Sequence, residues 1–207
     1  MIDTLLAMDP LVLASFVGAG IALNLTPGAD VMFAMASGAQ GGWRAGLAAA
    51  AGVSAGGLVH AVLAAIGLSA LIGAIPGALE GIRWAGAAYL AWLAVHTIRH
   101  AGTPVRADGA RALRRAFARG LLTNLLNPKV ILFILAFLPQ FADPRIGPVW
   151  QQMLALGVVF ALTGLVITGA YGALAGAFGT ALSARKRVLD RLAGAVFAGL
   201  ALRLVWT

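Results

Sequence analysis

The sequence has no cysteine and very few charged residues among its 207 positions. Without cysteine it can form neither disulfides nor thiolate metal sites, and we expect neither a metal nor a cofactor. Charged residues make up 11% of the chain and hydrophobic residues 61%, whereas soluble domains contain about 25% charged and about 45–50% apolar residues. A soluble fold of this length could not bury so much apolar surface, so we expect the lipid bilayer to be its solvent.

Six apolar runs are each long enough to cross a bilayer, which takes about 20 residues as a helix. None alternates with period two, so the sequence predicts an all-α polytopic membrane protein with six transmembrane helices. The runs are approximately Leu11–Ser37, Ala45–Ile72, Ala78–Ile98, Phe117–Leu138, Val149–Phe178 and Val188–Val205.

Acidic residues are scarce, which leaves a formal net charge of +8. This excess does not indicate a nucleic-acid partner, because the basic residues lie between apolar runs, where the positive-inside rule expects them. The loops after the first, third and fifth runs carry 11 Lys and Arg residues, against 3 on the other side. We therefore expect those loops in the cytoplasm and both termini outside.

Two polar interruptions stand out inside these runs. The first is Asn24-Leu25-Thr26-Pro27-Gly28-Ala29-Asp30, and the second is Asn124-Leu125-Leu126-Asn127-Pro128-Lys129. Each proline removes the hydrogen bond to the carbonyl four residues earlier, which breaks the helix there. Freed carbonyls are tolerated in a membrane only when they are buried in protein or line a watery cavity. The helix that resumes presents N–H groups and a partial positive charge.

The two interruptions repeat at a constant spacing along the chain. Pro27 and Pro128 are 101 residues apart, and so are Phe16 and Phe117. We therefore expect one transporter domain over residues 1–207, built from candidate repeats 11–98 and 117–205. Three spans per repeat make the halves inverted, which is a recurrent transporter design with broken helices near the midplane.

Asp30 and Lys129 are the costly residues at these breaks. A central Asp or Lys costs about 2.5–3.5 kcal/mol on insertion scales, so a functional role is the default. A zwitterionic amino acid suits such a site. Its carboxylate would lie against helix N-termini or Lys129, and its ammonium against freed carbonyls or Asp30. Directional hydrogen bonds are expected from the remaining polar side chains, namely Asn24, Thr26, Asn124 and Asn127.

Two ionisable side chains are candidates for proton transfer, although each has a structural alternative. Burial and a nearby cation shift a carboxyl pKa in opposite directions, so Asp30 could carry a proton whenever the occupancy of the site changes. Asp30 and Lys129 could instead form a structural ion pair. His60 lies within the second run and could relay protons or simply pack there.

One motif suggests a different class of protein. Gly52-Val53-Ser54-Ala55-Gly56 matches the nucleophile elbow of hydrolases, with His60 nearby. That motif requires a strand-to-helix turn, whereas this one lies within a helical run. The glycines also form a helix-packing pattern, which Gly42/Gly46 and Gly172/Gly176 repeat. We expect packing and no enzyme, with an intramembrane hydrolase using Ser54 and His60 as the alternative.

Taken together, several segments resemble the lysine exporter and homoserine/threonine resistance family of amino-acid exporters. The matching segments are Leu25–Asp30, Gly41–Leu47, Gly52–His60, Ala85–Leu90 and Gly120–Phe141. The chain departs from the family where Ala29 replaces a usual second proline, and near Gly57, where the family often has an acidic or amide residue.

The resemblance implies export of amino acids or close derivatives across the bacterial inner membrane, by exchange for protons. It also implies that the broken first and fourth spans form the site. The partners would be lipid, a small amino-acid substrate and protons. An uncoupled channel and a membrane scaffold are further alternatives, and the Gly pairs would also allow a homo-oligomer.

Overall fold

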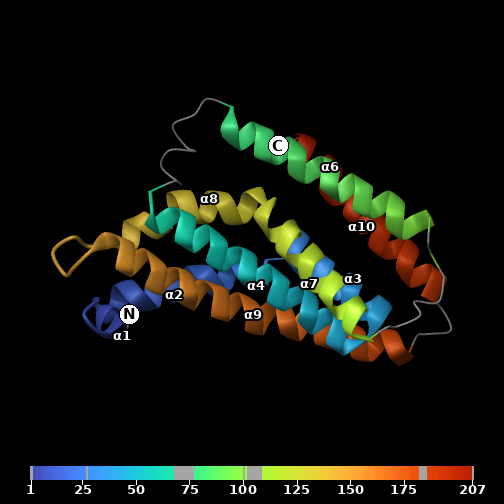
Figure 1. Ribbon diagram of the computed structural model, residues 1–207, viewed down its shortest axis with the longest axis horizontal. Coiled ribbons are helices and arrows are strands. Elements are labelled where there is room, and N and C mark those ends of the chain that lie inside the picture. Colours follow the sequence, from blue (N-terminus) through green and yellow to red (C-terminus); the bar gives the residue numbers. More distant parts are fainter. Residues whose placement is uncertain are drawn as a thin grey trace.

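The computed structural model describes residues 2–26, 28–67, 77–99, 101, 109–181 and 186–206. Every regular element within these ranges is a helix, which confirms the predicted all-α class (Figure 1). The elements are α1 (Ile2–Leu6), α2 (Pro10–Leu25), α3 (Ala29–Gly41), α4 (Trp43–Ala65), α6 (Ala78–Arg99), α7 (Gly109–Leu125), α8 (Pro128–Ala136), the 3-10 helix η1 (Leu138–Phe141), α9 (Val149–Ala181) and α10 (Lys186–Trp206).

The two predicted breaks each divide one apolar run into two helices. α2 and α3 meet at an angle of 52°, and α7 meets the α8–η1 segment at 58°. Pro27 itself lies outside the described residues. At the second break Asn127 caps α8 and Pro128 takes its first position, where the missing N–H costs nothing.

The length and hydropathy of the helices support only part of the predicted set of spans. α4 and residues Val149–Gly179 of α9 are each long and apolar enough to cross a membrane. Counting each bent pair as one span gives up to four spans among the described residues. α6 and α10 occupy the third and sixth predicted runs, and their described residues are not among these spans.

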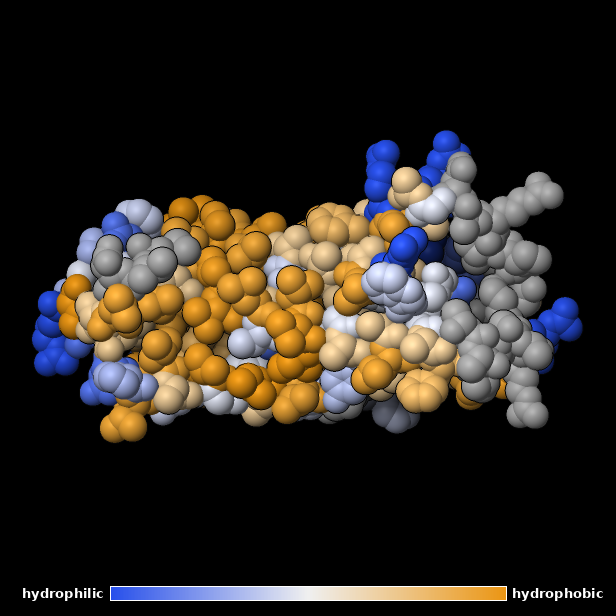
Figure 2. Space-filling view, turned by 90° about the horizontal axis from the view of Figure 1, so that it is seen from below, coloured by the Kyte–Doolittle hydropathy of each residue, from blue (hydrophilic) through white to orange (hydrophobic). Residues whose placement is uncertain are grey.

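The surface shows how the molecule fits a bilayer. In Figure 2 a broad hydrophobic band lies between hydrophilic ends. Tryptophans Trp43, Trp84, Trp150 and Trp206, all near helix ends, are exposed, as expected of aromatic belts at membrane interfaces. These features are those of a multi-pass membrane protein.

Close contact between α4 and α9 forms the centre of the fold. The two helices run antiparallel, because Gly172 of α9 packs on Gly46 of α4, and Gly157 packs on Ala61. A Cβ at Gly46 would collide with the carbonyl oxygen of Gly172. The other face of α4 packs on α7 in the same way, where Gly52 lies against the backbone of Phe117. These contacts confirm the packing role predicted for Gly46, Gly52 and Gly172, whereas Gly42 lies in the turn between α3 and α4 with a φ of 82°.

Apolar clusters flank this centre on two sides. One cluster joins α3 to the antiparallel pair of α6 and α10, which lies along one side of the molecule in Figure 1; it includes Phe33, Leu93 and Phe197. The other joins α2, α8, η1 and α9 and is rich in phenylalanine. In that cluster Phe16 packs against Phe141 at a centroid distance of 5.2 Å, and Phe133 against Phe160 at 4.9 Å.

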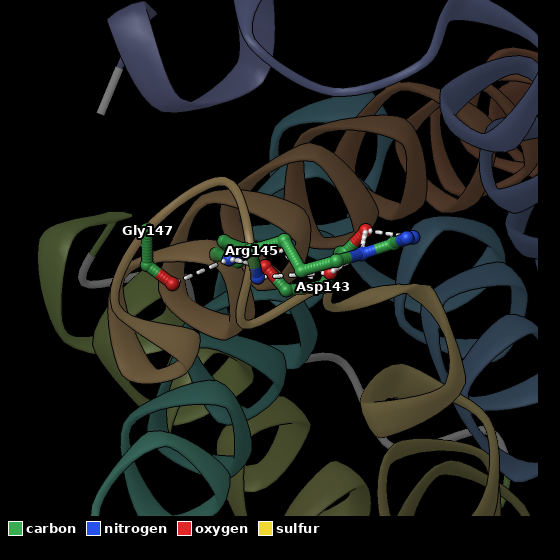
Figure 3. Close-up of polar contacts among 4 residues, drawn as sticks. Asp143, Arg145 and Gly147 are labelled. Carbon is green, nitrogen blue, oxygen red and sulfur yellow. Dashed lines mark hydrogen bonds and ion pairs between the residues drawn. The ribbon is translucent and has the colours of Figure 1, made fainter.

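The turn before α9 is held by a buried glutamine. Gln152 is fully buried, and its Nε2 donates to the carbonyl oxygens of Asp143 at 2.8 Å and Gly147 at 3.0 Å. Asp143 also pairs with Arg145 at 2.7 Å, as Figure 3 shows. Hydrogen bonds from Arg145 lower the pKa of the Asp143 carboxyl.

Candidate functional site between the two helix breaks

Asn127 organises the second break by capping α8. Its Oδ1 accepts a hydrogen bond from the backbone N–H of Lys129 at 3.1 Å, which satisfies one of the free donors at a helix N-terminus. The backbone N–H of Asn127 donates to the carbonyl of Asn124 at 2.9 Å. The sequence Asn-Pro therefore ends α7 and begins α8 within two residues.

Lys129 connects the two breaks through its side chain. The Nζ donates to the carbonyl oxygens of Leu23 at 2.9 Å and Thr26 at 3.0 Å. Leu23 is the residue whose carbonyl Pro27 cannot satisfy. A cation is disfavoured near the N-terminus of its own helix and favoured at the C-terminus of another. The C-terminal carbonyls of α2 therefore compensate for the position of Lys129 in the first turn of α8.

Gly28 leaves the room that this contact needs. A Cβ at Gly28 would lie 3.2 Å from the Nζ of Lys129, which is closer than ordinary van der Waals contact. The backbone of Gly28 is extended and would accept any residue. Any larger residue at this position would require the Lys129 side chain to shift by a few tenths of an ångström.

Asp30 lies in the first turn of α3 and binds the end of α7. Its Oδ2 accepts a hydrogen bond from the Nδ2 of Asn124 at 2.8 Å. Asn127 and Lys129 also interact electrostatically with this carboxylate. An acidic side chain is favoured at a helix N-terminus, so the macrodipole of α3 adds to these interactions.

Three atoms in this cluster are buried without a hydrogen-bond partner among the described residues. They are the Oδ1 of Asp30, the Oδ1 of Asn124 and the Nδ2 of Asn127. The three side chains are only 9%, 3% and 5% exposed, respectively. The amide of Asn127 is thus near the Asp30 carboxylate without meeting hydrogen-bond geometry. Buried polar atoms without partners are rare in folded proteins and call for an explanation.

His60 and Gly56 bring α4 to the same place. The Nε2 of His60 lies 3.3 Å from the carbonyl oxygen of Asn124, which is the carbonyl that Pro128 leaves free. One turn earlier, a Cβ at Gly56 would lie 2.6 Å from the Oδ1 of Asn124. Gly56 therefore provides space for a site side chain as well as for helix packing. The sequence signal for this position is the spacing of four residues between Gly56 and His60, which places both on the same face of a helix.

Two of the predicted side chains make other contacts. The hydroxyl of Thr26 donates to Ala22 in its own helix at 2.7 Å, so the main-chain carbonyl of Thr26, and not its side chain, binds Lys129. Asn24 donates to Thr163 of α9 at 3.3 Å, and this bond links α2 to α9. Sequence reasoning had not identified Thr163, because a single threonine in an apolar helix carries no distinctive pattern.

Ser54 and His60 do not form a nucleophile–base pair. The hydroxyl of Ser54 donates to the carbonyl of Ala161 at 2.6 Å, while His60 contacts Asn124. Both residues lie within the continuous helix α4, without the turn that a nucleophile elbow needs. This geometry gives the hydrolase alternative no support.

Comparisons with known proteins agree with one another. A family model described as LysE type translocator matches residues 21–207. The homoserine/homoserine lactone efflux protein of Salmonella typhimurium is 34% identical over 179 residues, or 84% of this chain and 86% of that protein. The leucine efflux protein of Klebsiella pneumoniae is 35% identical over 208 residues, or 93% of each chain. No solved structure gives a significant match.

Proposed function

Because the chain belongs to the LysE type translocator family, we propose that it exports amino acids or close derivatives from the cytoplasm in exchange for protons. The cluster around Asp30, Asn124, Asn127 and Lys129 is the proposed substrate and proton site. The observation that carries the proposal is the meeting of two broken helices at buried, incompletely bonded polar groups. Broken helices of this kind line the substrate sites of many transporters.

The chemistry of the relatives' substrates supports an amino-group ligand. Leucine, homoserine and homoserine lactone, which appear in the names of the relatives, all carry an α-amino group. The lactone has no free carboxylate, so the α-amino group is the charged feature that the three share. Acceptor atoms are therefore the more general requirement for a site of this family, and Asp30 and Asn124 supply them.

Proton exchange is supported by the position of Asp30. A carboxyl group inside the membrane is commonly part of an ion or proton pathway. If a proton and the substrate ammonium compete for this carboxylate, then loading one releases the other, which is the requirement for antiport. Asn124 joins Asp30 to His60, through its side-chain amide on one side and its carbonyl on the other. His60 is a candidate relay on that path.

We further propose that the two halves are inverted repeats, in a bacterial inner membrane with both termini outside. Support comes from the antiparallel pairing of α4 with α9, and of α6 with α10, in which Gly194 packs on Ile98. These are the second and third spans of each half. The excess of basic residues in the odd loops supports the orientation.

The test is efflux of labelled leucine, homoserine and homoserine lactone from preloaded cells, with and without a proton gradient. The native chain is compared with Asp30→Asn, which keeps the size of the side chain and removes its charge. Asn24→Ala is the matched control, because Asn24 lies at the same break but binds Thr163. We expect gradient-dependent efflux that Asp30→Asn abolishes and Asn24→Ala retains. Efflux that remains fully coupled in Asp30→Asn would refute the role of Asp30.

A further inference from the structure

Three carbonyl oxygens at the two breaks, those of Leu23, Thr26 and Asn124, already have partners. Lys129 donates to Leu23 and Thr26, and the carbonyl of Asn124 is bonded to Asn127 and lies next to His60. Electrostatics alone allows a substrate ammonium to bind either these carbonyls or Asp30. Since these three carbonyls are occupied by groups of the protein, the buried side-chain oxygens without a partner are the stronger candidates for binding the ammonium.

The unpartnered atoms form a set of two acceptors and one donor. Asp30 Oδ1 and Asn124 Oδ1 are acceptors, and Asn127 Nδ2 is a donor. The N-terminus of α3, a helix of 13 residues, adjoins them with no side-chain cap. An α-ammonium group has three N–H donors, and a carboxylate or ester carbonyl beside it has acceptors only. The set therefore complements the head group of an amino acid in one orientation.

We infer that the substrate's ammonium binds Asp30 Oδ1 and Asn124 Oδ1, while its carboxylate or carbonyl oxygen binds Asn127 Nδ2 and the N-terminus of α3. This assignment rests on the proposed function and specifies the orientation of the substrate in that site. The amide of Asn127 interacts with the Asp30 carboxylate, but its Nδ2 has no partner with hydrogen-bond geometry. A bound head group completes the hydrogen bonds of both side chains.

Lys129 takes a different part in this arrangement. Its ammonium is bonded to two carbonyls at the end of α2, and so it joins α8 to the first break. The substrate oxygen is oriented by the neutral amide of Asn127. A site that relies on a neutral donor accepts both a carboxylate and an uncharged ester carbonyl, whereas direct pairing with a lysine would favour the carboxylate alone.

The experiment measures the binding of three ligands to two variants of the purified protein in lipid nanodiscs. The ligands are leucine, 3-methylbutan-1-amine, which lacks the carboxylate, and 4-methylpentanoate, which lacks the ammonium. Asp30→Asn removes the proposed ammonium partner. Asn127→Asp keeps a capping oxygen for α8 but replaces the donor by a charged acceptor. Asn24→Asp adds the same charge at the first break, next to Thr163, and is the matched control.

We expect Asp30→Asn to weaken the binding of leucine and of the amine by about tenfold or more, since each loses a hydrogen bond to a charged group. The affinity for 4-methylpentanoate should change by less than about threefold. Asn127→Asp should weaken the binding of leucine and 4-methylpentanoate by about tenfold and leave the affinity for the amine unchanged or higher. The Asn24→Asp control should show no such division between the ligands. If Asn127→Asp does not fold, Asn127→Ser keeps a capping hydroxyl and removes the amide.

Two results would overturn the assignment while leaving amino-acid export intact. In the first, Asn127→Asp changes the affinities for leucine, the amine and the acid equally, which means that Asn127 and Asp30 interact with each other as a structural pair. In the second, Asn24→Asp divides the ligands as strongly as Asn127→Asp, which means that the effect is only long-range charge. A native protein that binds no leucine would instead remove both this inference and the proposed function.

Discussion

Replacing Lys129 by methionine should destabilise the protein by disconnecting its two helix breaks. Methionine has a similar length and no charge, so the change removes the hydrogen bonds from Nζ to Leu23 and Thr26 with little change in packing. Both carbonyl oxygens lie at the end of α2, where an i to i+4 bond is missing. In a membrane they have little access to water that could replace the lysine.

The size of the effect follows from these two bonds. Each hydrogen bond from a charged donor contributes about 1.5–3 kcal/mol, and the variant regains part of this because no ammonium has to be desolvated. The net loss should be about 3 kcal/mol, which is two such bonds at the lower end of that range. For a chain of about 200 residues this corresponds to a lower melting temperature by roughly 6–12 °C.

The assay is thermal unfolding of the purified protein in one detergent, followed by loss of the monodisperse peak. Arg145→Met is the matched control, because Arg145 also pairs with a partner but is 89% exposed. It should melt with the native protein, since exposed ion pairs contribute little. The reasoning is refuted if Lys129→Met melts within about 2 °C of the native protein, a shift equivalent to no more than about 1 kcal/mol.

The remaining predictions concern packing, capping and the turn before α9. Gly46→Ala should strongly lower thermal stability, because its methyl group would meet the backbone of Gly172, whereas Gly18→Ala, with no neighbouring atom within 4 Å, should be neutral or stabilising. Equal melting of these two variants would contradict the packing of α4 on α9. Asn127→Ala should cost about 1 kcal/mol through the lost cap of α8, and Asn127→Ser should recover most of it in the same unfolding assay. Because Arg145 lowers the pKa of Asp143, the ion pair stabilises the turn above the ordinary carboxyl pKa, and this contribution disappears as pH falls through the lowered pKa. The protection factors of the Arg145 and Ile146 amides, which both bond to Asp143, should therefore fall only in acid. Arg145→Met should move that transition to higher pH, and an unchanged transition would contradict the pairing.

The sequence was sufficient to locate the breaks but not their contacts. Proline and asparagine inside apolar runs predict where a helix ends, because the missing N–H and the ring clash are local effects. The same rule assigns the carbonyls that the prolines cannot bond to Leu23 and Asn124, four residues before each proline. It could not choose the partner of Lys129, since a long flexible side chain reaches either a carboxylate or a carbonyl. Only the packing of residues about a hundred positions apart decides between them.

The sequence does not predict several other contacts, for the same reason. Asn24 and Thr26 look equivalent to Asn124 in a list of polar residues at a break. In the structure Asn24 binds Thr163 and Thr26 binds its own helix, because each side chain faces a different neighbour. Gly56 belonged to a general packing pattern, and its closeness to Asn124 depends on how α4 crosses α7. Periodicity predicts the buried face of a helix but does not identify the residue opposite.

The most direct test of proton-coupled export uses proteoliposomes that contain leucine and a pH-sensitive dye. When they are diluted into leucine-free buffer, outward movement of leucine should draw protons inward and acidify the lumen. Asp30→Asn vesicles should show no acidification. Leucine efflux without any change in lumenal pH would contradict proton exchange, and vesicles that retain all their leucine would contradict export of this amino acid.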